Sequence, residues 1–511
     1  MDGSTDSKAE DFGPFGRKLF ADDNVKALSR VGIVDVGSNS VRMVVFDGAA
    51  RSPAYFFNEK ILCGLGLGMS ETGKLNPEGR VRALAAMRRF QLLAEGMGIA
   101  PLSAAATAAV READDGQDFI DEVFRETGLR LYVIPGEEEA RFSAQGVLLG
   151  WPEADGLVCD IGGSSMELAE VHLGKVGKRV STPLGPQKLL SFQGDHKDLR
   201  KHIASVLEPV VGTIGRGNDH IYLVGGSWRA IARIDMLRRN YPLTVLHEYR
   251  MTPNDIAETV KFIAASDMKK IGAQIGTSEA RMELVPIAAE VLGQLIPAFT
   301  PGDIAVSSYG IREGMLYEQM PKALRRRDPL IESCRFVESR DARLPGFGDA
   351  LFDFILPIFP QADKARRRII EAACLLHDVS WRSHPDYRHE VCFEAATRAN
   401  LGGLTHPERV FLGLALLHRY KNSREGSQFT PLFKLLSDTE IQDAEIVGKA
   451  MRFGAMLAFD TPANAGRFTY DHAAKKLTLT LTELGRGLFG EVAAARLKSL
   501  TNSLGASTEV I

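Results

Sequence analysis

The sequence has few cysteines and no long apolar runs. Its cysteines are scattered through apolar segments, with no CxxC pair among them: Cys63, Cys159, Cys334, Cys374 and Cys392. An odd, scattered set argues against a disulfide framework and predicts small buried side chains in a reducing compartment. No stretch of 18 residues is uninterruptedly apolar, and residues 1–29 lack the apolar core of a signal peptide. We therefore expect a cytoplasmic protein with no membrane association.

An excess of charge of either sign is also missing. Lysine and arginine number 62 against 65 acidic residues, so the net charge of −3 by itself indicates no partner. Hydrophobic content of 45% is typical of a soluble globular protein. With 511 residues the chain is too long for one core and should form about three or four domains.

One short phrase occurs twice. DVGSNS at residues 35–40 is similar to DIGGSS at 160–165, and each follows an apolar, strand-like run. A strand that ends in a Gly/Ser turn aims backbone N–H groups at an anion. Two such turns facing each other would hold a phosphate chain, with an Asp beside each to hold Mg²⁺. The repeat predicts a duplicated phosphate-handling fold with a cleft between its halves.

Strands and helices are expected to alternate through the first part of the chain. Asn76 followed by Pro77 predicts a helix start, and a third Gly/Ser turn at 225–227 joins a strand to a helix. Such alternation is typical of an α/β protein. We expect the following parts: a flexible tail over 1–29, two α/β lobes over 30–142 and 143–317, a helical domain over 318–440, and a small α+β domain over 441–511.

The glycines of Gly64-Leu65-Gly66-Leu67-Gly68 resemble a dinucleotide fingerprint. The next helix is expected only near Asn76, however, and the fingerprint needs a helix that opens at its last glycine. We therefore interpret this segment as a mobile glycine loop.

Carboxylates accompany the turns. Glu137, Glu138 and Glu139 form a run that ordinarily marks a solvated helix start. Here the run lies between the two halves, where a carboxylate could orient and deprotonate the water that hydrolyses a phosphoanhydride. Asp160 and Glu167 flank the second turn and are typical Mg²⁺ ligands, and Asp35 has the corresponding place in the first copy.

Taken together, these segments resemble one family. DVGSNS, GEEEAR at 136–141, DIGGSSMEL at 160–168 and VGGS at 224–227 are similar, in order and spacing, to the motifs of the exopolyphosphatase / guanosine pentaphosphate phosphohydrolase family. The resemblance covers about residues 30–315. It implies two ribonuclease H-like lobes of the actin-like ATPase superfamily, followed by an all-α HD-like domain and the small α+β domain.

The resemblance also assigns roles to residues. It implies Glu139 as catalytic base, Glu167 as second catalytic carboxylate, and Asp160, Glu167 and Asp35 as the metal site for Mg²⁺. The phosphate-binding residues it implies are Gly37, Ser38, Asn39, Arg111, Gly162, Gly163, Ser164, Ser165, Gly225, Gly226 and Ser227. Ser164 stands where the family commonly has a third glycine.

The helical region contains His377-Asp378, the kernel of an HD metal site. No histidine occurs between His247 and His377, so the ligand set is incomplete and a two-metal hydrolase is not expected. We interpret His377, His384, His389 and His418 as packing or anion-contacting residues. Basic clusters at 325–327, 364–368 and 419–424 favour a polyphosphate track over a solvated face, and no RNA-stacking motif accompanies them.

These observations predict an exopolyphosphatase that releases terminal orthophosphate from inorganic polyphosphate. The alternatives are hydrolysis of pppGpp to ppGpp, phosphoryl transfer from polyphosphate to ADP with the VGGS turn on a nucleotide, and a non-enzymatic polyphosphate scaffold. No nucleic acid partner is expected. The resemblance makes a homodimer the expected assembly.

Overall fold

The computed structural model describes residues 19–20, 30–48, 50–99, 102–192 and 196–511. The tail expected over 1–29 lies outside the described residues except for Leu19 and Phe20. Phe20 is 1% exposed and packs in an apolar core, so this residue is not part of a loose tail. The chain divides into two compact units, Met1–Arg327 and Asp328–Ile511.

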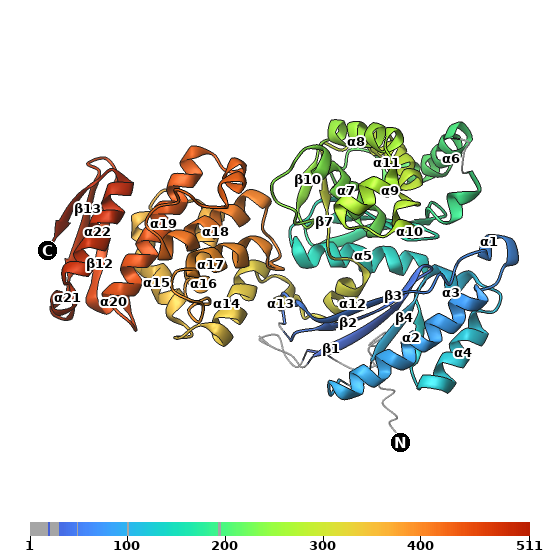
Figure 1. Cartoon of the computed structure of the whole chain (residues 1–511), viewed down its shortest axis with the longest axis horizontal. Helices are drawn as coiled ribbons and strands as arrows, with labels where there is room; N and C mark the ends of the chain where they lie inside the picture. The colour runs from blue at the N-terminus through green and yellow to red at the C-terminus, as the bar shows by residue number, and fades with distance from the viewer. Residues whose placement is uncertain (1–18, 21–29, 49, 100–101, 193–195) are drawn as a thin grey trace, which may run out of the picture. The chain divides into compact units, whose positions relative to one another are not determined.

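The first sheet of the N-terminal unit has the order β3-β2-β1-β4-β5 (Figure 1). Its strands are β1 (Val31–Val36), β2 (Ser40–Phe46), β3 (Tyr55–Leu62), β4 (Ser103–Ala106) and β5 (Leu131–Val133). β1, β2 and β3 are antiparallel neighbours, whereas β4 and β5 continue parallel to β1.

The second sheet repeats this arrangement and adds one edge strand. Its order is β10-β11-β9-β6-β7-β8, so β8-β7-β6-β9-β11 corresponds to β3-β2-β1-β4-β5. The strands are β6 (Gly156–Ile161), β7 (Met166–His172), β8 (Lys175–Thr182), β9 (His220–Val224), β10 (Tyr249–Met251) and β11 (Asp303–Val306). The duplication predicted from the two Gly/Ser turns is therefore present in the strand order of both sheets.

Two helices lie between the sheets, α5 (Gly136–Gly150) and α12 (Ile311–Gln319) (Figure 1). They pack so closely that a Cβ at Gly314 would lie 1.7 Å from the carbonyl oxygen of Phe142. The domain boundaries expected at 142/143 and 317/318 fall inside these helices. Both helices bury side chains in a core shared by the two lobes, which is why neither position is a break in the fold.

Further helices cover the outer faces of the sheets. Those of the first lobe are α1 (Met69–Thr72), α2 (Pro77–Gly96), α3 (Ala108–Glu112) and α4 (Gly116–Thr127). Those of the second lobe and its exit are η2 (Lys188–Phe192), α6 (His196–Ile214), α7 (Gly226–Arg238), α8 (Pro253–Ala265), α9 (Met268–Ile275), α10 (Glu279–Met282), α11 (Val285–Phe299) and α13 (Lys322–Arg325). The predicted cap is present, because the Asn76 side chain accepts from the Gly79 N–H at 2.8 Å.

One segment of the described residues, Glu279–Phe299, is long and apolar enough to cross a membrane by length and composition. Its apolar window is 67% buried within the protein. Val291, Leu292 and Leu295 pack in the core of the second lobe, so the segment has the burial of a core helix.

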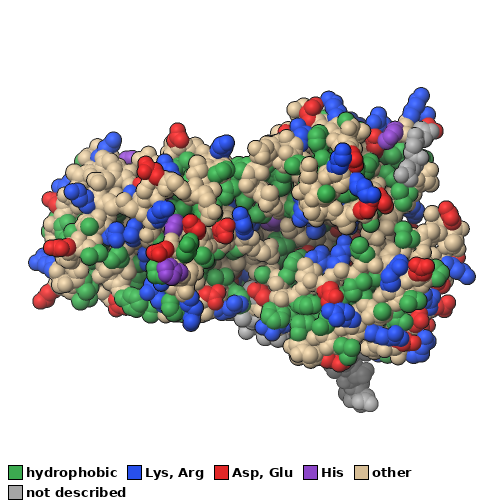
Figure 2. Space-filling view, viewed as in Figure 1, with side chains coloured by type: hydrophobic (Ala, Val, Ile, Leu, Met, Phe, Trp, Pro, Cys, Tyr) green, Lys and Arg blue, Asp and Glu red, His purple; other side chains and the backbone are tan. Residues whose placement is uncertain are grey.

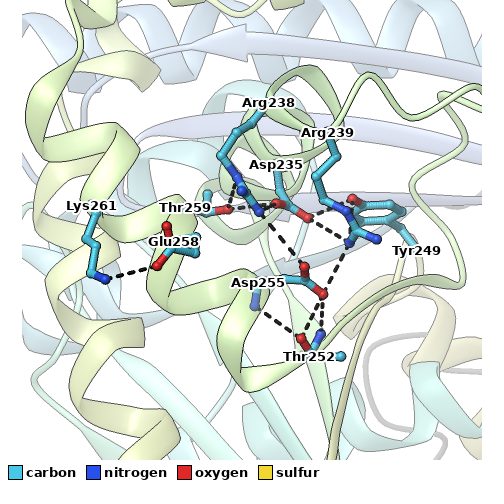
Figure 3. Close-up of polar contacts among 9 residues, drawn as sticks. All are labelled: Asp235, Arg238, Arg239, Tyr249, Thr252, Asp255, Glu258, Thr259 and Lys261. Carbon is cyan, nitrogen blue, oxygen red and sulfur yellow. Dashed lines mark hydrogen bonds and ion pairs between the residues drawn. The ribbon is translucent and has the colours of Figure 1, made fainter.

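The C-terminal end of α7 is fixed by a buried carboxylate (Figure 3). Asp235 is fully buried and accepts hydrogen bonds from the hydroxyls of Tyr249 and Thr259, each at 2.7 Å. Arg238 and Arg239 add ion pairs at 2.8 and 3.4 Å. Because Tyr249 belongs to β10 and Thr259 to α8, the network ties the end of α7 to both of these elements.

The C-terminal unit is mainly helical, with a small sheet. Its helices are α14 (Pro329–Asp341), α15 (Phe347–Ile355), η3 (Leu356–Ile358), α16 (Lys364–Leu376), α17 (Arg388–Arg398), α18 (His406–Tyr420), η4 (Thr430–Leu435), α19 (Asp438–Leu457), α20 (Pro462–Ala465), α21 (Glu483–Leu488) and α22 (Glu491–Leu504). Antiparallel β12 (Gly466–Asp471) and β13 (Lys476–Leu481) are joined by parallel β14 (Ser507–Val510). The boundary expected at 440/441 falls inside α19.

Candidate active site

The two Gly/Ser turns have the same local geometry. The Gly37 N–H donates to the Ser40 carbonyl at 3.0 Å, and the Gly162 N–H donates to the Ser165 carbonyl at 2.9 Å. Each turn thus closes a strand hairpin, β1–β2 in one lobe and β6–β7 in the other. The Ser164 hydroxyl donates to the Ser38 hydroxyl at 2.9 Å, so the turns meet face to face.

A cavity of about 220 Å³ lies where the turns meet. The backbone N–H groups of Ser38, Asn39 and Gly163, which line it, have no acceptor among the described residues. Unpaired backbone donors at two opposed turns form an anion-binding concavity.

The third Gly/Ser turn completes the wall of this cavity. Gly225 has φ of +115°, and a Cβ there would lie 2.5 Å from the Ile161 carbonyl oxygen, so the position requires glycine. Gly226 begins the thirteen-residue helix α7, whose N-terminal N–H groups favour an anion. Arg281 covers this turn and donates to the Ser227 hydroxyl at 3.2 Å.

Three carboxylates of the cavity are near one another. Asp160 and Glu167 are register partners across β6 and β7, and Glu139 comes from the first turn of α5. Glu139 and Glu167 are 5% and 3% exposed. Burial, reinforced by the charge of Glu167, raises the pKa of Glu139 well above its usual value, although Arg111 lowers it. Burial and the charge of Asp160 raise the pKa of Glu167 to about 8. Burial outweighs the nearby positive charges, so these carboxylates favour a further cation or a proton beside them.

Each carboxylate has a positioning partner. Arg111 forms an ion pair with Glu139 and also donates to the Ile134 carbonyl at 2.6 Å. Ser181 donates to Glu167 at 2.9 Å, and Ser143 donates to Asp160. Arg111 therefore reaches the site through Glu139 and does not line the cavity itself.

The carboxylate oxygens of Asp160 and Glu167 are suitable ligands for a hard cation such as Mg²⁺. Burial raises the pKa of Asp160, as it does for Glu167, and a divalent charge would offset this penalty. Asp35 already pairs with Arg312 at 3.3 Å. Among the described residues, no three His, Cys, Asp or Glu side chains converge on one metal position. The remaining ligands of such an ion would be water and phosphate oxygens, which Mg²⁺ usually retains.

Five cationic side chains line the same cavity, and the sequence did not single them out as site residues. They come from β2, β3, α7, α10 and α12: Arg42, Lys60, Arg229, Arg281 and Arg312. Figure 2 shows Lys and Arg side chains in the hollow between the two lobes of this unit. SYGIREGML at 308–316, which contains Arg312, was a recognisable signal. Arg42 and Arg229 each lie two residues after a Gly/Ser motif, DVGSNS at 35–40 and VGGS at 224–227, so proximity to these motifs could have indicated them. Lys60 and Arg281 carry no such signal.

The cations repel one another in the absence of an anion. Partial desolvation, together with the charges of Arg281, Arg42 and Arg229, lowers the pKa of Lys60 to about 8. Burial and the charge of Arg312 lower the pKa of Arg42 to about 10. The side chains of Lys60 and Arg229 make no hydrogen bond to any residue the structure describes, and the Arg229 Nε is shielded from solvent. Their surplus charge favours a polyanionic ligand.

The glycine loop at 64–68 is not the mobile segment expected from the sequence. Its Gly66 N–H donates to the Ser38 carbonyl at 2.8 Å, and the N–H groups of Cys63 and Gly64 donate to the Asn39 carbonyl at 3.0 Å. The loop therefore braces the first turn from behind, and the glycines allow this close approach.

The structure brings most of the residues expected at the site to one cavity. Those lining it are Asp35, Gly37, Ser38, Asn39, Glu139, Asp160, Gly162, Gly163, Ser165, Glu167, Gly225 and Gly226. Ser164 and Ser227 are buried just behind the lining, at the contacts with Ser38 and Arg281.

Comparison with known proteins identifies two family matches. The model of the Ppx/GppA phosphatase family matches residues 44–323. The model of the exopolyphosphatase C-terminal region matches residues 353–511.

Individual relatives are distant. Retrograde regulation protein 2 of Saccharomyces cerevisiae is 25% identical over 449 residues, covering 78% of this chain and 74% of its own. Exopolyphosphatase 1 of Mycobacterium tuberculosis is 25% identical over 304 residues, covering 57% and 88%. The crystal structure of an exopolyphosphatase from Cytophaga hutchinsonii aligns with a TM-score of 0.53 at 24% identity, covering 57% of this chain and 98% of that one. This likeness, with the duplicated sheets, supports the expected α/β fold of two similar lobes.

Proposed function

Because the chain belongs to the Ppx/GppA phosphatase family, we propose that it is an exopolyphosphatase, releasing terminal orthophosphate from inorganic polyphosphate. The observation that carries the proposal is the cavity itself. Unpaired backbone donors of two opposed turns, five cations and two buried catalytic carboxylates line one space. This combination suits a dense chain of phosphates.

The chemistry of the lining favours polyphosphate over a nucleotide. None of the described residues lining the cavity is aromatic, so no ring is placed to stack on a base. Arg281 lies against the VGGS turn, with its Nη2 2.8 Å from where a Cβ of Gly226 would be. A guanidinium thus covers the turn that an adenosine would have to contact in a phosphotransferase.

In the proposed reaction the terminal phosphate lies on the N–H groups of Ser38, Asn39 and Gly163. Glu139 orients a water molecule and accepts its proton as the water oxygen bonds to the terminal phosphorus. The bridging P–O bond breaks, orthophosphate leaves, and the chain is one phosphate shorter. Arg111 acts through Glu139 by fixing its orientation, because it bonds both Glu139 and the Ile134 carbonyl.

Mg²⁺ is part of the proposal, held by Asp160 and Glu167 with phosphate and water oxygens. When bound, it supplies neutralisation of phosphate charge. Asp35, which was predicted as a third Mg²⁺ ligand, forms an ion pair with Arg312 instead.

We further infer that the helical domain is HD-like but cannot hold the two metals of a hydrolase. Asp378 is already paired with Arg343, whose Nε and Nη2 donate hydrogen bonds to its carboxylate at 2.7 and 2.6 Å. The burial of His377, with the nearby charge of Arg419, lowers the pKa of the imidazole to about 4. A homodimer remains the assembly that we propose from the family resemblance.

A substrate panel tests this function. Phosphate release from long-chain polyphosphate and from pppGpp is compared by kcat/KM, with and without Mg²⁺, and ATP formation is measured with polyphosphate and ADP. We expect Mg²⁺-dependent release that favours polyphosphate, and no ATP. The Glu139→Gln variant is the control for contaminating phosphatase.

Other outcomes would replace the proposal. Higher kcat/KM for pppGpp would make the protein a pentaphosphate phosphohydrolase, and ATP formation would make it a phosphotransferase. Tight polyphosphate binding with no release at any Mg²⁺ concentration would indicate a binding scaffold.

A further inference from the structure

A cavity of about 590 Å³ lies within the C-terminal unit. Its lining comes from η3, α16, α18, α19 and β12 and from the segments beside them. Cavities that hold small molecules have volumes of about 300–1,000 Å³, so this one is large enough for a small organic ligand. The reaction proposed above makes no use of it.

Much of the lining of this cavity is apolar. Buried side chains form one part of it: Ile358, Ile369, Ile370, Phe411, Ile446 and Val447. Phe359, Tyr470 and Leu504 line it as well and are only partly buried, so their apolar surface is left for a ligand to cover. Covering this surface removes it from water, and a ligand with an apolar body is therefore favoured.

Carboxylates outnumber cationic side chains around the cavity. The lining includes one arginine, Arg366, and the exposed His472, against four carboxylates: Asp363, Glu408, Glu440 and Asp443. The Arg366 guanidinium lies 3.9 Å from the centre of the Phe411 ring, and its Nη2 lies 3.8 Å from Oε1 of Glu440. Its charge therefore offsets that of Glu440 and leaves a surplus of negative charge, which favours a cationic ligand.

Asp443 differs from the other three carboxylates in its surroundings. Asp363, Glu408 and Glu440 each accept a backbone N–H at a helix start, at 2.7, 2.8 and 2.9 Å respectively. Asp443 makes no hydrogen bond and no ion pair with any residue that the structure describes. Partial burial raises the pKa of the Asp443 carboxyl, although Arg366, beyond ion-pair distance, lowers it. A cation beside Asp443 would offset the cost of this burial.

We propose that this cavity is a binding site for a small organic cation, an ammonium group carried on an apolar body. The ammonium donates to the Asp443 carboxylate, and the body contacts Phe359, Tyr470 and the apolar lining. A cation near aromatic rings also gains attraction from their faces. An anion of the same shape is disfavoured by the surplus of carboxylates. The site uses residues of the C-terminal unit alone and does not depend on the reaction proposed above.

Three probes with one apolar body test the role of charge. Phenylbutylamine, phenylbutanol and phenylbutyrate end in a positive, a neutral and a negative group at neutral pH. Their dissociation constants for the full-length protein are measured by saturation-transfer NMR at one salt concentration. We expect the amine to bind about tenfold more tightly than the alcohol, because its hydrogen bond to Asp443 joins two charged groups. Phenylbutyrate should bind this cavity most weakly of the three.

Variants link the binding to this cavity. Asp443→Asn keeps the shape of the side chain and removes its charge, so it should weaken binding of the amine about tenfold and leave that of the alcohol unchanged. Asp438→Asn is the matched control, because Asp438 is an exposed carboxylate of the same helix and lies outside the lining. Ala365→Trp, at an exposed position of the lining, fills the cavity and should abolish binding of both probes.

Four results would overturn the proposal. They are absence of amine binding at millimolar concentration, amine binding no tighter than that of phenylbutyrate, amine binding that persists in Ala365→Trp, and amine binding unchanged in Asp443→Asn. Asp443→Asn decides the matter even where Ala365→Trp fails to fold, because the substitution is isosteric and Asp443 makes no bond that the fold would lose.

Discussion

The hydroxyl of Ser164 lies 2.9 Å from that of Ser38, 126 residues away in sequence and in the other lobe. This bond joins the two Gly/Ser turns, and the free N–H groups beside it face one cavity. Two copies of one strand-turn-strand segment therefore line a single cavity, which neither copy forms alone.

Replacing Glu139 should abolish hydrolysis and leave binding intact. In Glu139→Gln the amide cannot accept the proton of the attacking water, so kcat should fall about 10²–10⁴-fold. Glu137→Gln is the matched control, because Glu137 is exposed in the same helical turn. Phosphate release and polyphosphate binding measured together check both parts. Unchanged release by Glu139→Gln would remove this residue from the mechanism.

In the pH profile of kcat/KM, a carboxylate should set the acid limb and a lysine should set the alkaline limb. Burial raises the pKa of Glu139, so the rate should rise as this carboxylate loses its proton. Lys60 has a pKa of about 8 and loses its positive charge above it, so phosphate binding should weaken at alkaline pH. We expect a bell-shaped profile whose alkaline limb begins near pH 8.

The alkaline limb identifies Lys60. Lys60→Arg keeps its charge at high pH and should move this limb upward by at least about one pH unit. Lys60→Met should lower kcat/KM below pH 8 and remove the limb. Lys74→Arg, at an exposed position, is the control. An alkaline limb that stays in place in Lys60→Arg would assign it to another group.

The contact between α5 and α12 should not tolerate a methyl group. A Cβ at Gly314 would lie 1.7 Å from the Phe142 carbonyl oxygen, and both atoms belong to helix backbones that cannot move independently. Gly314→Ala should cost about 3 kcal/mol or more. Gly212→Ala in α6 meets no atom within 4 Å and should stabilise by about 0.5–1 kcal/mol. Urea denaturation of both variants measures the difference, and equal stability would contradict the packing described.

The buried and exposed carboxylates in Figure 3 should differ sharply. Asp235→Ala leaves Arg238 and Arg239 without their buried partner and should destabilise by about 3–5 kcal/mol. Glu258, paired with Lys261 at 2.9 Å on the surface of α8, should change stability by less than about 0.5 kcal/mol when replaced by Gln. Tryptophan fluorescence during denaturation reports on this unit through Trp151 and Trp228. A small effect of Asp235→Ala would mean that water replaces the carboxylate.

The sequence by itself determined the duplicated α/β core and the positions of its Gly/Ser turns. These features are local: Asp35-Val36-Gly37-Ser38 specifies a strand end and a turn within a few residues, and the second copy repeats it. The cap at Asn76 and the pairing of β12 with β13 are predictable for the same reason.

Only the tertiary structure decided which charges share a space. Lys60, Arg229 and Arg281 come from three elements with no sequence signal in common, and their convergence follows from how the lobes pack. The pKa values of Glu139 and Glu167 depend on burial by residues distant in sequence. The pairing of Asp378 with Arg343 likewise requires the turn after α16 to meet the loop after α14. Local propensity sets where a side chain points along its own element, whereas desolvation and Coulomb interactions depend on distances that only the folded chain defines.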